Sequence, residues 1–106
     1  MLDYHDAKIC RMAITMTPGN WDVALDLLVQ GRDVKVTFEA IWWVGVHGLG
    51  MVANEEQIYS IMETSWDEVP ANCRYEAGGN KTFEIQCSSG SKILVVAGKL
   101  IESVIP

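Results

Sequence analysis

The clearest pattern of apolar and polar positions runs from Asp33 to His47. Every second residue of this stretch is apolar: Val34, Val36, Phe38, Ala40, Trp42, Val44 and Val46. Because successive side chains of a β-strand point to opposite faces of the sheet, this row predicts a long strand that packs its even-numbered positions against the core. The opposite face is polar at first and then carries Ile41, Trp43 and His47.

Further segments favour β-strands. Residues Lys81–Cys87 alternate between apolar and polar, and Lys92–Ala97 contains an Ile-Leu-Val-Val run that predicts a strand buried on both faces. A Ser-Ser-Gly-Ser turn separates these two segments. Lys8–Met16 fits a helical stripe as well as one face of a strand, and we favour the strand. Leu100–Ile105 is a further candidate strand.

Two segments predict helices. The first is bounded by a capping residue, Thr17 or Asn20, and by Gly31, which suits the left-handed position after a helix. Between them an apolar stripe recurs at helical spacing: Trp21, Ala24, Leu25 and Leu28. We therefore predict a helix of about three turns here.

The second helix is predicted to start at Asn54 and to end before Pro70. Its inward face consists of Ile58, Ile61 and Met62. Its opposite face is acidic and consists of Glu56, Glu63 and Asp67. A solvated surface is the usual meaning of such a face, and the alternative is a contact with a basic partner.

These elements predict an α+β fold, with two helices packed on a mostly antiparallel sheet of four to five strands. The chain has 106 residues, of which 49% are hydrophobic and 21% are charged. This composition excludes a disordered chain, and we predict a single globular domain over residues 1–106.

The adjacent pair Trp42-Trp43 is the most informative feature for function. Neighbouring residues of a strand face opposite sides, so the two indoles cannot enter one core. We place Trp42 in the apolar row and Trp43 on the other face, with Ile41 and His47. A bare indole forgoes a large gain from burial, so Trp43 needs a cover. The alternatives are a helix of the same chain, a second subunit or a ligand.

Charge and cysteine content restrict the class of protein. The net charge is −6, and no cluster of Lys and Arg is present for binding nucleic acid directly. The three cysteines show no close pair for zinc and no disulfide framework, which favours a reducing cytoplasm. No stretch resembles a signal peptide or a membrane helix. The glycine-rich stretch 45–50 does not match a phosphate-binding loop.

No assembled catalytic set is visible, and we predict no catalytic residue, metal or cofactor. The first hypothesis is a small acidic, non-enzymatic, homodimeric protein-interaction module whose binding residues are Ile41, Trp43, His47, Glu56, Glu63 and Asp67. The alternative is a small-molecule-binding domain or small enzyme with a pocket near Trp43 and His47. A minor alternative is an acidic inhibitor of a basic, nucleic-acid-binding partner. The expected partners are a second copy or a protein with a basic surface, without direct contact to nucleic acid or membrane.

Overall fold

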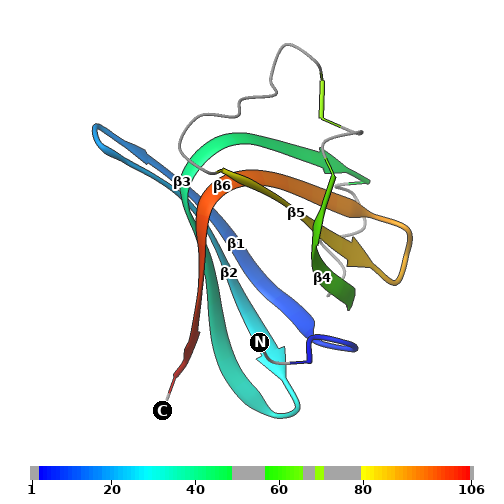
Figure 1. The fold of residues 1–106 in the computed structure, drawn as a ribbon. Coiled ribbons are helices and arrows are strands. Elements are labelled where there is room, and N and C mark those ends of the chain that lie inside the picture. Colours follow the sequence, from blue (N-terminus) through cyan, green and yellow to red (C-terminus); the bar gives the residue numbers. More distant parts are fainter. Residues whose placement is uncertain (1–2, 49–56, 66–68, 71–79, 106) are drawn as a thin grey trace.

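The computed structural model describes residues 3–48, 57–65, 69–70 and 80–105. In these residues the chain forms strands and no helix: β1 (Lys8–Thr17), β2 (Asn20–Val29), β3 (Arg32–His47), β4 (Ile58–Thr64), β5 (Lys81–Cys87) and β6 (Lys92–Val104). They form one antiparallel, six-stranded sheet in the order β1-β2-β3-β6-β5-β4 (Figure 1). The predicted α+β class, with two helices on four to five strands, is therefore wrong, and the fold is all-β.

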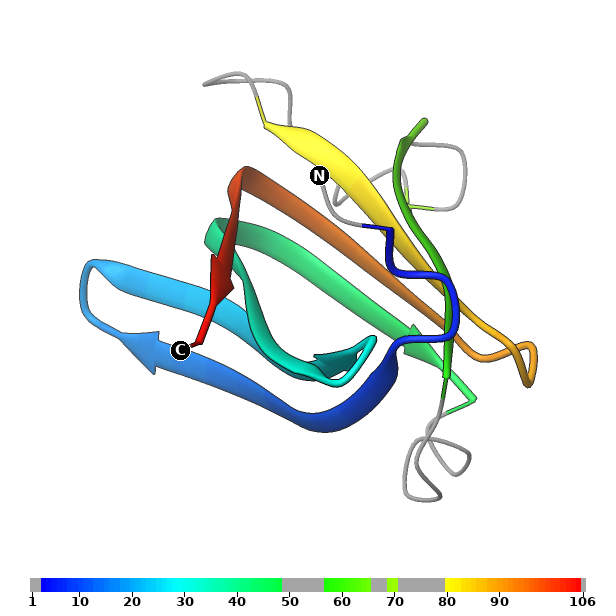
Figure 2. The ribbon, with the colours of Figure 1, turned by 90° about the horizontal axis from the view of Figure 1, so that it is seen from below.

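The sheet consists of two three-stranded meanders joined by the pairing of β3 with β6. Since the chain crosses from β3 to the far edge before returning through β5, strands β3 to β6 form a Greek key. The sheet is strongly bent (Figure 2), and its two edges touch at one end. There the Ile58 amide donates to the Ala7 carbonyl (2.7 Å), and the Asp6 amide donates to the Ile58 carbonyl (2.9 Å). The sheet thus rolls around a core.

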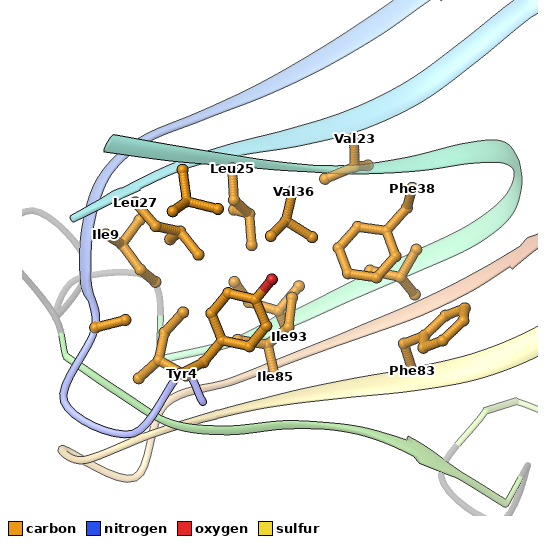
Figure 3. Packing of buried hydrophobic residues seen from close by; sticks show 14 of the residues in the cluster. Tyr4, Ile9, Val23, Leu25, Leu27, Val36, Phe38, Phe83, Ile85 and Ile93 are labelled. Atoms are coloured by element: carbon orange, nitrogen blue, oxygen red, sulfur yellow. The ribbon is translucent and has the colours of Figure 1, made fainter. Parts of the chain in front are cut away.

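The core lies on the concave side of the rolled sheet. Figure 3 shows side chains from β1, β2, β3, β5 and β6, together with Tyr4, pointing toward one another. Phe38 and Phe83 meet with ring centroids 5.4 Å apart and ring planes tilted by 52°. Phe38 is fully buried and Phe83 is 6% exposed. These rings come from the two meanders, so their contact helps to hold the halves of the sheet together.

The first predicted helix is strand β2 instead. Four alternate residues of β2 are buried at 5% exposure or less: Val23, Leu25, Leu27 and Val29. The apolar residues of this segment fit the helical period of 3.6 as well as the strand period of 2. The predicted helical stripe included Leu28, which is 37% exposed. The segment forms a strand because it pairs with β1 on one side and with β3 on the other. Its backbone amides and carbonyls then form hydrogen bonds to both neighbouring strands.

The residues taken as helix signals are turn residues. Thr17 pairs with Asn20 across the two-residue loop Pro18-Gly19, and Gly19 has φ 79°. Proline followed by a glycine of positive φ is typical of a type II turn. The next loop contains Gln30 (φ 50°) and Gly31 (φ 80°), as a type I′ hairpin turn requires. Gly31 therefore closes a hairpin and does not end a helix.

The second predicted helix is also wrong where the structure describes it. Ile58–Thr64 is the edge strand β4, paired with β5. Glu63 is exposed, and its carboxylate lies 3.8 Å from the Lys81 ammonium. Glu56 and Asp67 lie outside the described residues. The acidic helix face therefore does not exist as predicted, since its central part is extended.

The remaining strand predictions are confirmed. Lys8–Thr17, Lys81–Cys87 and the segment from Lys92 are strands, and residues 93–97 are buried on both faces. The candidate strand at Leu100–Ile105 is the continuation of β6, which runs to Val104. Cys87 lies in the core, whereas Cys10 is exposed at a bulge in β1.

Candidate functional site

The long strand β3 changes direction at Ala40. This residue has φ 55°, in the left-handed region that alanine rarely adopts, and a β-bulge follows between Ile41 and Trp43. Ile41 packs against the core. Trp42 is 53% exposed, so its predicted place in the core row is wrong. The bulge inserts one extra residue at position 42 and turns that indole outward.

Replacing Ala40 by glycine is expected to stabilise the fold by up to about 1 kcal/mol, because glycine adopts positive φ without a Cβ clash. Denaturant unfolding measures the change. The matched control is Ala24→Gly on β2, which lies in ordinary strand and should lose about 0.5–1 kcal/mol. A loss of similar size at both positions would contradict the left-handed conformation of Ala40.

Trp43 lies on the outer face of β3, over Gly45. A Cβ at position 45 would overlap the Trp43 indole, so glycine leaves the space that the ring occupies. The cross-strand partners of these two residues are Val96 and Leu94, both buried at 1% exposure or less. Trp43 itself is half-buried. Part of the cover predicted for this indole is therefore supplied by its own strand.

A second apolar surface lies where β1 and β2 extend beyond the core. Ile14 pairs with the buried Val23, and Met16 pairs with Trp21, so these side chains share the inward face. The exposed fractions are 52% for Ile14, 67% for Met16 and 52% for Trp21. The projecting hairpin is visible in Figure 1. The apolar face of the sheet thus continues past the core into water.

The hairpin and the bend of β3 enclose a hollow of about 250 Å³. Its lining residues are Ile14, Thr15, Met16, Trp21, Asp22, Ile41, Trp42, Trp43 and Val44. A more open hollow of about 420 Å³ adjoins it and shares three of these residues, Trp21, Ile41 and Trp42. We call the five residues Ile14, Met16, Trp21, Ile41 and Trp42 the hairpin groove. Contiguous exposed apolar surface of this kind marks binding sites.

The predicted site residues that the structure describes lie in different parts of the sheet. Ile41 and Trp43 line the hollow, but His47 is exposed at the end of β3 and is not among the lining residues. Glu63 lies on β4, at the opposite edge of the sheet. Glu56 and Asp67 fall outside the described residues.

Sequence reasoning missed four of the five residues of the groove. It predicts Trp21 in a helix, Ile14 and Met16 in a strand without a role, and Trp42 in the core row. The available signal was the Pro-Gly pair, since a tight turn there places Met16 beside Trp21.

The groove offers hydrophobic contact more than chemistry. Among the residues that the structure describes, no group of three or more His, Cys, Asp or Glu side chains is placed to hold a metal ion. The described part of the chain also contains no helix suited to crossing a membrane.

No protein-family model matches the chain, and no curated protein matches its sequence.

Proposed function

We propose that the chain is a non-enzymatic protein-interaction module that binds its partner through the hairpin groove. The observation that carries this proposal is the inward apolar face of β1 and β2, which leaves Ile14, Met16 and Trp21 about half or more exposed. Trp42 adds a second exposed indole from β3. Tryptophan is enriched among the residues that dominate binding energy at protein interfaces.

The size of the groove supports a protein partner. Two half-exposed indoles leave roughly 200 Å² of aromatic surface in water. Covering that area gains at most about 5 kcal/mol at 25 cal/mol per Å², before the costs of association. Ile14 and Met16 extend the same surface along β1. Such a surface is adequate for the apolar centre of an interface with a polar rim.

A photo-cross-linking amino acid at Met16 is expected to give a covalent adduct of higher mass in the native cell extract, because this side chain is 67% exposed in the groove. The matched control carries the same amino acid at Gln86, which is exposed on β5. Trp21→Ser should reduce the Met16 adduct several-fold. Adducts no stronger from position 16 than from position 86 would contradict the proposal.

A small apolar ligand is the second candidate, and the aromatic lining of the hollow favours it. The volume of about 250 Å³, lined by three tryptophans, is just below the usual range of ligand pockets and suits a small molecule. Such a ligand would quench or shift tryptophan emission, and Trp42→Phe would remove most of the response. An unchanged emission spectrum across a broad library of apolar compounds would leave the protein partner as the remaining candidate.

A further inference from the structure

Strand β1 forms one edge of the sheet, and most of its outer side is open in the described structure. It pairs with β2 along its whole length on one side. On the other side its only strand contact among the described residues is the bridge from Lys8 to Gln57. From Arg11 to Thr17 no other described strand runs alongside it (Figure 2).

The sequence of this edge lacks the features that normally prevent strand pairing. Residues 12–17 read Met-Ala-Ile-Thr-Met-Thr, with no charge, proline or glycine. Natural edge strands are usually short, or carry a charged residue or proline. The other edge strand, β4, follows that rule, since it has seven residues and carries the exposed Glu63. From residue 12 to residue 17 the β1 edge is uncharged, and it is continuous with the hairpin groove.

The backbone groups of three residues face the open edge. A two-residue hairpin loop is closed by a hydrogen-bonded pair, here Thr17 and Asn20. Hydrogen-bonded and non-hydrogen-bonded pairs alternate along an antiparallel ladder. The amides and carbonyls of Met12, Ile14 and Met16 therefore point away from β2. The same three side chains lie on the inward face of the sheet.

We infer that a second copy of this chain pairs antiparallel with the open edge of β1, with Ile14 on the two-fold axis, and so extends the hairpin groove. This inference rests on the proposed function. The length of the open edge determines which residues pair. All residues from Arg11 to Thr17 find a partner only when Ile14 of one chain lies opposite Ile14 of the other. Met12 then faces the partner's Met16, and about six backbone hydrogen bonds form.

Charge and shape are compatible with this pairing. The chain carries a net charge of −6, so two copies repel one another over most of their surface. Residues 8–21 contain Lys8 and Arg11 and no acidic residue, so this stretch brings no acidic side chain into the contact. In the proposed register Arg11 lies opposite the partner's Thr17, away from the partner's Arg11. The apolar inward faces of the two hairpins join into one surface.

The unmodified chain is expected to have twice the mass of one chain in sedimentation or light scattering at high micromolar concentration. Added salt should tighten the dimer by screening the net repulsion. Ile14→Pro should give the mass of one chain. Proline removes the amide hydrogen that faces the open edge, and it leaves the hydrogen bonds between β1 and β2 intact. Ile14→Lys leaves every backbone group in place and should also give monomer, by placing two ammonium groups at the axis.

Disulfide cross-linking tests the register. In a Cys10→Ser background, Ile14→Cys should form a covalent dimer on oxidation, because paired Cα atoms lie about 5.5 Å apart. Thr15→Cys is the matched control, since its copies would lie roughly 8 Å apart and cannot bridge. Equal cross-linking at positions 14 and 15 would overturn this register.

A chain that stays monomeric at high micromolar concentration would overturn self-pairing. The proposed function would then still stand if position 16 forms an adduct with a different protein. If the dimer forms but position 16 gives no adduct above the Gln86 control, the groove is not the binding surface and the proposed function fails. The two failures are therefore distinguishable.

Discussion

Replacing Phe38 by alanine is expected to lower the free energy of unfolding by about 3–5 kcal/mol. Phe38 is fully buried on β3, and its ring packs against Phe83 of β5 at a centroid distance of 5.4 Å. Its removal leaves a cavity between the two meanders, which the paired strands on both sides cannot close. Because a domain of this size has a total stability of about 5–15 kcal/mol, thermal unfolding should shift by some tens of degrees.

The matched control is Trp42→Ala, a larger truncation four residues along the same strand. Trp42 is 53% exposed, and we expect its loss to change the free energy of unfolding by no more than about 1 kcal/mol. Comparing the two variants tests the bulge directly, because a strand without a bulge would place the rings of Phe38 and Trp42 both in the core. Equal losses at the two positions, measured by denaturant unfolding, would show that position 42 faces inward.

Where apolar and polar residues alternate cleanly, the sequence alone predicts the strand. Residues Lys81–Cys87 and the row from Val34 to Phe38 alternate without an ambiguous position, and burial follows the alternation except at Thr82, which is 2% exposed. The segment at β2 is different, because its apolar residues satisfy both the helical and the extended period. Only pairing with β1 and β3 decides between them, and that choice depends on contacts distant in sequence.

The change of face at Trp42 could not be predicted from local sequence. No glycine, proline or asparagine marks position 40, although its backbone is left-handed. The determinant lies on β6: a Cβ at Gly98 would meet the Ala40 Cβ at 3.2 Å, so the bend of β3 needs the glycine opposite it. The exposed indole of the groove therefore depends on a residue almost sixty positions away.

The candidate site was predicted in part. The sequence predicts that the two indoles of Trp42-Trp43 cannot enter one core, and the exposure of Trp42 agrees with this. The exposed member is Trp42, however, while Trp43 finds partial cover over Gly45. The hairpin half of the groove was missed because Trp21 was assigned to a helix, which has no open edge and no continuous apolar face with β1.

The stability of the protein is expected to fall at alkaline pH because of Tyr4. Tyr4 is 3% exposed, and Figure 3 shows its hydroxyl pointing into the core cluster. Burial raises the pKa of the Tyr4 phenol well above its ordinary value, and the neighbouring Glu102 carboxylate raises this pKa further. Glu102 is opposite Val36 in the β3–β6 register, which places it on the inward face.

The sign of the effect follows from the direction of this pKa shift. Above a pH of about 10 the unfolded chain loses the Tyr4 proton while the folded chain keeps it, so the unfolded state is favoured. The contribution of Tyr4 is fully present below that pH. It is then lost at about 1.4 kcal/mol per pH unit as the pH rises toward the raised pKa of the folded state.

Urea unfolding between pH 8 and pH 12 measures this dependence, and Tyr4→Phe should remove the part of the slope that begins near pH 10. Tyr59→Phe is the matched control for removal of a tyrosine hydroxyl, because Tyr59 is 56% exposed. If Tyr4→Phe retained the full alkaline slope, another group would have to be the source. Because Tyr4 packs where the two edges of the sheet meet, loss of its neutral form should open the rolled sheet at that end first.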